Sequence, residues 1–337
     1  MTGKATTPRE PGAPSSGGSS AVRAATRPAA AGRPLPTGTS ASMRARRRRE
    51  TVAGYALLAP SLVGLVVFLL VPVALVLVLS LTDYRIAQGA DPSWVGLDNY
   101  RDLLTDRAFR NSILITALYV AITIPLTVLG GLGLAVLLHR NLPASGALRV
   151  IFLLPWVCSP VALGVVWQWM LAPSGGALNA MIGQRVEWMS NPSLALPTVA
   201  FVSAWSTIGY VSLFFLAGLQ QIPASVYEAA KLDGAGPFRT LTSITVPLLR
   251  PTMFFVLVTT IIASFQVYDL VYGLTGGSPG YPAGRTDVIA ARIYNEAFSS
   301  LHIGSASAMA VVLFVVLVAV TFVQQRYFAR RTTYDMS

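Results

Sequence analysis

The segment Glu228–Pro237, which reads EAAKLDGAGP, is a short charged stretch set between two long apolar ones. The run before it, Pro192 to Gln220, and the run after it, Pro251 to Tyr268, contain no Asp, Glu, Lys, Arg or His. Charged side chains are costly inside a bilayer and collect outside its hydrocarbon core. The pattern therefore predicts a polar loop at one face of a membrane bundle, where another protein can bind it.

The composition places the whole chain in a membrane. Hydrophobic residues make up 53% of it and charged residues 12%, whereas soluble domains carry roughly 25% charged residues. The formal net charge is +11, and many of the basic residues lie in the first 49 positions. A polyanion-binding tail is one reading of that charge. We favour a membrane-surface anchor and expect no nucleic-acid partner.

Cysteine and histidine give no sign of a metal or cofactor site. Cys158 is the single cysteine and lies in an apolar run, so we expect it to be an inert packing residue. His139 and His302 lie far apart in the sequence, without the spacing of metal ligands. The sequence predicts no bound metal and no cofactor.

The amino-terminal region divides into two parts. Residues 1–42 contain almost no large apolar side chains, which predicts disorder. Residues 43–52 include the basic cluster Arg44–Arg49, and each such charge near an anionic leaflet contributes about 1 kcal/mol of attraction. The apolar run that follows is longer than the roughly 7–15 residues of a signal peptide's apolar core, and no clear cleavage site follows it. We therefore predict an uncleaved first membrane span.

Six stretches are apolar over about the 20 residues that cross a ~30 Å hydrocarbon core. They predict an all-α membrane domain over residues 53–330, followed by a short tail, 331–337. The predicted spans are 55–81, 113–138, 150–171, 194–219, 252–274 and 305–324.

Charge also predicts the orientation of the bundle. An even number of spans puts both termini on one side, and basic residues near the membrane are in excess on that side. The amino end, the carboxyl end and the loop 222–251 are therefore expected in the cytoplasm.

The loop has the signals of two short helices joined at a corner. Pro223 suits a helix start, the following Glu-Ala-Ala run favours helix, and Asp233-Gly234 marks a stop. Pro237 can open a second helix, which Pro247 ends. From spacing alone, an amphipathic connector lying on lipid is the alternative.

Residue spacing in this loop resembles the EAA loop of binding-protein-dependent ABC importer permeases. Further stretches resemble the carbohydrate-uptake branch of that family, which includes the maltose and glycerol-3-phosphate permeases: Val95–Tyr100, Phe265–Leu270 and Ile293–Phe298. The resemblance covers about residues 50–330. The loop positions that match the motif and its surroundings are Glu228, Ala229, Ala230, Asp233, Gly234, Ala235, Ile244 and Pro247.

The resemblance implies a six-helix permease subunit of a type I importer in a bacterial cytoplasmic membrane. Its loop would dock into a separate ATP-hydrolysing subunit, with Ala229 and Ala230 filling the contact. The implied partners are a second, similar permease chain, two ATP-binding subunits, an extracytoplasmic solute-binding protein, membrane lipid and a carbohydrate substrate.

The chain contains no ATP site of its own. A phosphate-binding loop needs a lysine after a glycine-rich turn, and Lys4 and Lys231 are the chain's two lysines, neither in that setting. A proton- or sodium-coupled sugar carrier is the rival function, but it usually needs ionisable groups deep in its spans. Asp269, near one end of the fifth span, is the one candidate. A membrane enzyme would need a catalytic constellation that the sequence does not contain.

Aromatic and amide side chains in the fourth and fifth spans are candidates for the substrate pathway, because aromatic faces and amides suit a sugar. These residues are Trp205, Tyr210, Gln266, Tyr268 and Asp269. The alternative is that the Trp and Tyr side chains serve as interface anchors or in packing, which is their more frequent role in membrane helices.

Overall fold

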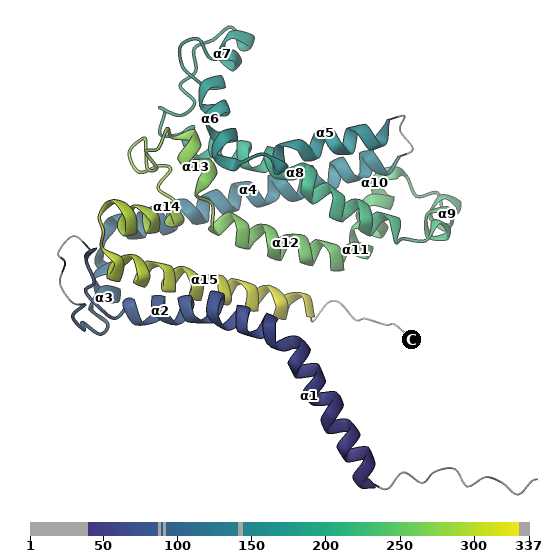
Figure 1. Cartoon of the computed structure of the whole chain (residues 1–337). Helices are drawn as coiled ribbons and strands as arrows, with labels where there is room; N and C mark the ends of the chain where they lie inside the picture. The colour runs from purple at the N-terminus through teal and green to yellow at the C-terminus, as the bar shows by residue number, and fades with distance from the viewer. Residues whose placement is uncertain (1–39, 87–88, 90–91, 141–143, 330–337) are drawn as a thin grey trace, which may run out of the picture. The chain divides into compact units, whose positions relative to one another are not determined.

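The computed structural model describes residues 40–86, 89, 92–140 and 144–329, and Figure 1 shows a chain built of helices. It comprises two compact units, Met1–Val63 and Gly64–Ser337. The first contains most of α1 (Ser40–Leu65), which includes the basic segment 43–52. Helix thus begins within the last three residues of the segment predicted to be disordered. Residues 1–39 of that segment, and the carboxyl tail 331–337, lie outside the described residues.

The second unit holds the rest of the helices. In chain order these are η1 (Val66–Leu70), α2 (Val71–Leu79), α3 (Asp98–Thr105), α4 (Arg107–His139), α5 (Ser145–Val157), α6 (Pro160–Met170), α7 (Ala177–Ile182), α8 (Ala195–Gln220), α9 (Ala224–Leu232), α10 (Pro237–Thr240), η3 (Leu241–Thr245), α11 (Val246–Leu248), α12 (Arg250–Phe265), α13 (Asp269–Leu274), α14 (Ile289–Tyr294), η4 (Asn295–Ser299) and α15 (Ile303–Ala329). In Figure 1, α9 lies at one end of this bundle, and α3 and α14 lie at the other.

Within the described residues, four uninterrupted helical segments are long and apolar enough to cross a membrane: Arg48–Leu79, Arg107–His139, Ala195–Gln220 and Ile303–Phe328. Two further pairs of helices meet this criterion together but are bent, Ser145–Val157 with Pro160–Met170 and Pro237–Leu248 with Arg250–Phe265, which gives six spans if each pair counts as one. The predicted fourth span coincides closely with α8. The predicted third and fifth spans differ from straight helices, and both differences shape the site described below.

The predicted third span, 150–171, is broken into α5 and α6, which meet at 95°. Cys158 and Ser159 have extended backbone between the two helices, and Pro160 is the first residue of α6. A residue that precedes proline is pushed away from helical geometry, and proline suits the first position of a helix. The bend is thus encoded by Ser159-Pro160.

The predicted fifth span, 252–274, is also interrupted. Helix α12 ends at Phe265, and α13 begins only at Asp269. Irregular backbone at membrane depth occurs where it lines a cavity or is buried in protein. Helix α13 packs against α6, where a Cβ on Gly164 would lie 2.8 Å from the Cα of Gly273, so this close approach requires glycine.

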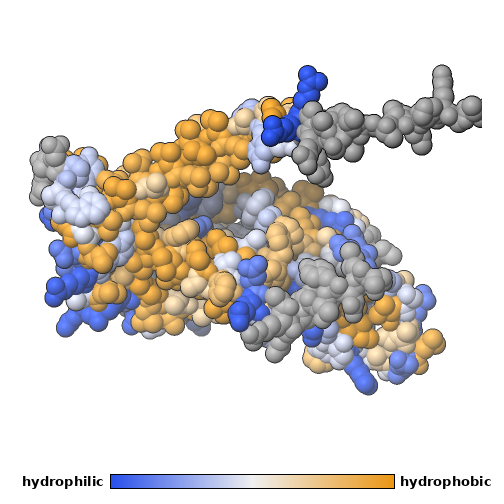
Figure 2. Space-filling model, turned by 90° about the horizontal axis from the view of Figure 1, so that it is seen from below, coloured by the Kyte–Doolittle hydropathy of each residue, from blue (hydrophilic) through white to orange (hydrophobic). Residues whose placement is uncertain are grey.

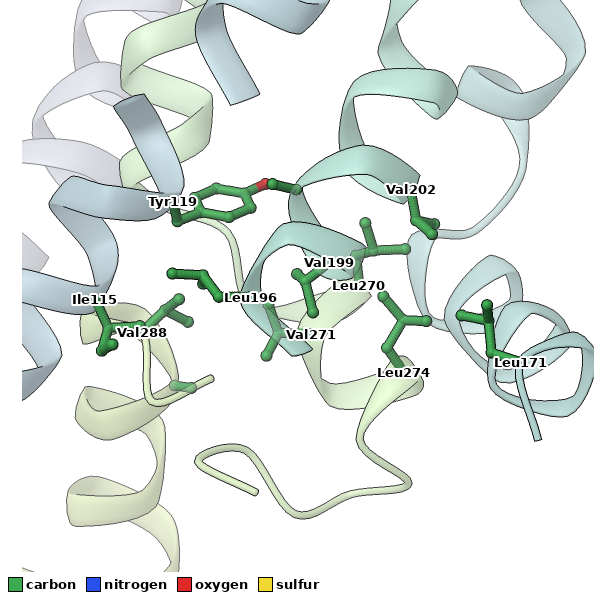
Figure 3. Packing of buried hydrophobic residues seen from close by; sticks show 12 residues of the cluster. Ile115, Tyr119, Leu171, Leu196, Val199, Val202, Leu270, Val271, Leu274 and Val288 are labelled. Carbon is green, nitrogen blue, oxygen red and sulfur yellow. The ribbon is translucent and has the colours of Figure 1, made fainter. Parts of the chain in front are cut away.

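The core of the bundle lies around the long contact between α4 and α8. One buried cluster contains Tyr119 from α4, Val199 from α8 and Val271 from α13, and Figure 3 shows these side chains converging. By contrast, no residue of α2 is buried, although it is apolar throughout. Figure 2 shows hydrophobic side chains covering much of the displayed face, as expected of a lipid-embedded protein.

Candidate functional sites: an exposed loop and an internal cavity

The loop 222–251 folds as two short helical pieces joined at a glycine corner. Helix α9 follows Pro223 and ends at Leu232. Gly234 has φ +72°, its N–H donates to the Lys231 carbonyl at 3.1 Å, and the Ala235 N–H donates to the Ala230 carbonyl at 2.9 Å. These two bonds form a Schellman motif, which uses the left-handed conformation that glycine adopts without penalty. Helix α10 then begins at Pro237, as the sequence predicts.

The loop turns one side to the surroundings and the other to the chain itself. Glu228, Ala229, Asp233 and Gly234 are exposed, whereas Ala235, Ile244 and Pro247 are half-buried. Ala230, expected from the family resemblance to fill a contact with a partner, is only 4% exposed. Its side chain lies on the inner face of α9 and packs within this chain, so that expectation is corrected.

Two large apolar side chains stand on the exposed side of this loop. Leu232 is 90% exposed and Phe238 is 76% exposed. Sequence reasoning missed both, although an apolar residue within an otherwise polar loop was a signal that could have found them. Glu228 and Ala229 are exposed as well, and we call these four residues the loop surface.

The inner side of the loop is anchored in the core. Thr245 is buried and donates a hydrogen bond to the Tyr227 hydroxyl at 3.5 Å. Leu249 is buried in the same cluster as Val211 and Phe215 of α8. A displacement of the loop would therefore be transmitted directly to α8 and α12.

A cavity of about 440 Å³ lies within the bundle. Its walls come from α4, the α5–α6 bend, α8 and the break between α12 and α13, so both interrupted spans contribute to it. The lining residues are Tyr119, Thr123, Thr127, Pro155, Trp156, Cys158, Pro160, Leu163, Ser203, Ser206, Thr207, Tyr210, Thr259, Thr260, Ala263, Ser264, Gln266, Val267, Tyr268, Asp269 and Leu270.

Hydroxyl groups dominate the polar part of this lining. Tyr119 and Ser203 are hydrogen-bonded through their hydroxyls at 2.6 Å, which joins α4 to α8. The Thr127 hydroxyl is buried and has no hydrogen-bond partner among the described residues. The Thr127 side chain is fully buried, so a molecule in the cavity does not reach this hydroxyl in the present conformation, whereas Thr259, an exposed residue of the lining, is accessible.

Four of the five predicted pathway residues, Tyr210, Gln266, Tyr268 and Asp269, line the cavity. Trp205 does not, because it packs edge-on against Trp167 with the ring centroids 5.3 Å apart.

The structure adds cavity residues that the sequence did not single out. Trp156 stacks on Tyr210 with the rings 4.1 Å apart and nearly parallel, at 4°. Cys158 is exposed and lines the cavity, so the expectation that it is an inert packing residue is wrong. Its place beside the helix break, and not the apolarity of its neighbours in the sequence, decides its environment.

The opposite end of the bundle is held by a polar cluster. Arg292 donates to Asp287 through Nη2 at 3.2 Å, and the Ser112 hydroxyl donates to the same carboxylate at 2.9 Å. Burial raises the pKa of the Asp287 carboxyl, while the charge of Arg292 opposes that rise. The cluster ties the segment before α14 to the start of α4.

Comparison with known proteins identifies the family. Residues 127–334 match the family described as the binding-protein-dependent transport system inner membrane component. The sn-glycerol-3-phosphate transport system permease protein UgpA of Agrobacterium fabrum is 34% identical over 288 residues, which cover 83% of this chain and 96% of that protein. This chain belongs to the binding-protein-dependent permease family.

Other permeases show the same degree of similarity. The sulfoquinovosyl glycerol transport system permease protein SmoG of Agrobacterium fabrum is 32% identical over 80% of this chain and 88% of that protein. The trehalose/maltose transport system permease protein MalF of Thermococcus litoralis is 32% identical over 82% of this chain and 93% of that protein.

A solved structure shares the fold. A chain of a bacterial alginate ABC transporter in complex with its periplasmic protein superposes with a TM-score of 0.73, covering 85% of this chain and 96% of that one at 23% identity. The predicted all-α fold of a type I importer permease is confirmed. The chain is a multi-pass membrane permease subunit of an ABC importer, and the proton- or sodium-coupled carrier is not supported.

Proposed function

We propose that this chain forms half of a saccharide pathway that a separate ATPase opens and closes through the loop surface. The observation that carries the proposal is the pairing of an exposed two-helix loop with a polar cavity through shared helices. Leu249 anchors the loop beside α8 and Val256 of α12, and both helices contribute residues to the cavity wall. Movement of the loop would thus reshape the cavity.

The loop surface suits docking into another protein. Leu232 and Phe238 offer apolar side chains that a partner groove can cover, and Glu228 supplies a charge beside them. Interfaces are commonly built around such large apolar anchors with a polar rim. We assign Glu228, Ala229, Asp233 and Gly234 to the contact, and Ala235, Ile244 and Pro247 to the shape of the loop.

The charge distribution supports a cytoplasmic loop with both termini on the same side. The proposed assembly contains this chain, a second permease chain, two ATP-binding subunits and an extracytoplasmic solute-binding protein. A binding-protein partner is consistent with the family description.

The chemistry of the cavity supports a saccharide as substrate. A stacked aromatic pair, Trp156 and Tyr210, offers a flat apolar face for a sugar ring, while hydroxyls and the Gln266 amide offer hydrogen bonds. Ligand sites of this kind combine aromatic walls with a few convergent polar groups. The names of MalF and SmoG, which mention trehalose, maltose and sulfoquinovosyl glycerol, agree with this class.

Replacement of Glu228 by Lys tests the proposal. In the complete transporter reconstituted in proteoliposomes, we expect ATP-driven uptake to fall at least tenfold while the chain still inserts and assembles. Asp102→Asn, an exposed carboxylate on α3 at the other end of the bundle, serves as the matched control and should leave uptake unchanged. Normal uptake by Glu228→Lys would refute a coupling role for the loop surface.

A further inference from the structure

We propose that the half-pathway formed by this chain selects uncharged saccharides over anionic ones. The inference rests on the proposed function, which places the substrate in the cavity, and goes beyond it by naming the charge class of that substrate.

The charges in the cavity lining carry the proposal. Every lining residue is among the described residues, and none of them is Lys, Arg or His. Asp269 is the one Asp or Glu in the lining, so the lining contains an acidic side chain and no basic one. It lies at the break between α12 and α13, beside Tyr268 and Gln266, which also line the cavity.

An anionic substrate would find no compensation in this setting. Carboxylates, phosphates and sulfonates are recognised by charge-assisted hydrogen bonds, above all from Arg and Lys. A charge removed from water without such a partner pays a large desolvation cost. The Asp269 carboxylate would add charge repulsion.

A neutral sugar fits the same lining well. Its hydroxyls can donate to the Asp269 carboxylate and exchange hydrogen bonds with accessible side-chain hydroxyls of the lining, such as those of Ser206 and Thr259. Its apolar ring face can lie on the Trp156–Tyr210 pair. The lining thus favours many weak neutral contacts over one strong ionic contact.

Overall similarity does not decide this question. The names of UgpA and SmoG contain anionic compounds, a phosphate ester and a sulfonate, whereas that of MalF contains the neutral sugars trehalose and maltose. All three are similar to this chain to nearly the same degree. The chemistry of the cavity lining favours a neutral substrate over an anionic one.

Two small probes with the same sugar ring can test the inference: methyl glucoside, which carries a neutral hydroxymethyl group at C6, and methyl glucuronide, which carries a carboxylate there. The complete membrane complex is placed in lipid nanodiscs without the solute-binding protein, so the specificity of that protein does not enter. Cys158, the chain's single cysteine, lines the cavity and serves as the reporter. Its alkylation by a neutral maleimide is followed by mass spectrometry of the peptide that contains it.

We expect methyl glucoside to slow the labelling of Cys158, and methyl glucuronide to require at least a tenfold higher concentration for the same protection. Asp269→Asn should narrow that gap several-fold, whereas the control Asp102→Asn should leave it unchanged. Protection by both probes at equal concentration would overturn the inference and leave the proposed function standing. Protection by neither would overturn both the inference and the placing of the substrate in this cavity.

The reagent's own charge gives a second readout on the same thiol. A cationic methanethiosulfonate should label Cys158 faster than an anionic one. The ratio of the cationic to the anionic labelling rate should be larger for Cys158 than for a free thiol in solution. Asp269→Asn should bring the ratio down. If Asp269→Asn left this ratio of labelling rates unchanged, Asp269 would not determine the electrostatic potential in the cavity, which would contradict the inference.

Discussion

The loop 222–251 and the cavity are built in opposite ways. The loop is one continuous stretch whose shape follows from local signals: proline at helix starts, and the glycine corner at Gly234 with two backbone hydrogen bonds. The cavity draws its lining from residues 119 to 270, over several helices and two helix breaks. The shape of a docking loop can therefore be encoded by neighbouring residues, whereas a substrate pathway depends on how distant segments pack. Substitutions in the loop should impair ATP-driven coupling, whereas substitutions around the cavity should impair packing or substrate binding.

The largest effect is expected where α5 packs against α8. A Cβ on Gly209 would lie within van der Waals overlap of the Phe152 carbonyl oxygen, and backbone atoms cannot move aside cheaply. We expect Gly209→Val to prevent recovery of a folded complex from detergent, measured by size-exclusion chromatography. Gly133→Val on α4, where a Cβ meets nothing within 4 Å, is the control and should yield normal complex. Equal recovery of both variants would refute the close contact.

A substitution at the loop corner should abolish coupling and spare assembly. Gly234 has φ +72°, and a Cβ there meets nothing within 4 Å, so the cost is conformational. The left-handed conformation costs roughly 1–2 kcal/mol for ordinary residues and more for a β-branched one. We expect Gly234→Val to lower ATP-driven uptake at least tenfold with normal yield of the complex. Gly234→Asn should stay within about twofold of wild type, because Asn tolerates this conformation. Equal uptake by the two variants would contradict the role of the corner.

A smaller effect is expected when one wall of the cavity is trimmed. Stacked aromatic pairs contribute about 0.5–1.5 kcal/mol, so Trp156→Ala should raise the KM for transport roughly two- to tenfold with little change in kcat. Trp205→Ala removes an indole that does not line the cavity and should leave KM unaltered. Uptake kinetics in proteoliposomes measure both. A larger KM effect from Trp205→Ala would place the pathway elsewhere.

The same contrast explains what the sequence could and could not predict. It predicted the fold, the stop at Gly234 and the helix start at Pro237, because each depends on a few neighbouring residues. It did not predict the breaks at Cys158–Pro160 and after Phe265, although Ser159-Pro160 is a local signal for the first, because the spans were identified by length and apolar character. A hydropathy window registers apolarity and length, and a bend leaves both unchanged.

Side-chain environments were predicted less well than backbone shape. Of the residues proposed for the substrate pathway, Tyr210, Gln266 and Asp269 line one cavity, whereas Trp205 lies outside it and Trp156, which lines it, was not proposed. Indoles in membrane helices serve at interfaces, in packing and in ligand sites, and only tertiary packing tells these roles apart. Ala230 shows the same limit at the loop, since which face of α9 is covered depends on Thr245 and its neighbours.

The most direct test measures whether the loop controls the cavity. In the complete complex, the rate of Cys158 alkylation is compared between the nucleotide-free state and a state trapped with ATP and vanadate. We expect the alkylation rate of Cys158 to differ at least threefold between the two states in the wild type. In Gly234→Val, where the ATPase still binds nucleotide, we expect no difference in that rate. The same change in both proteins, or no change in the wild type, would contradict the claim that the loop drives the cavity.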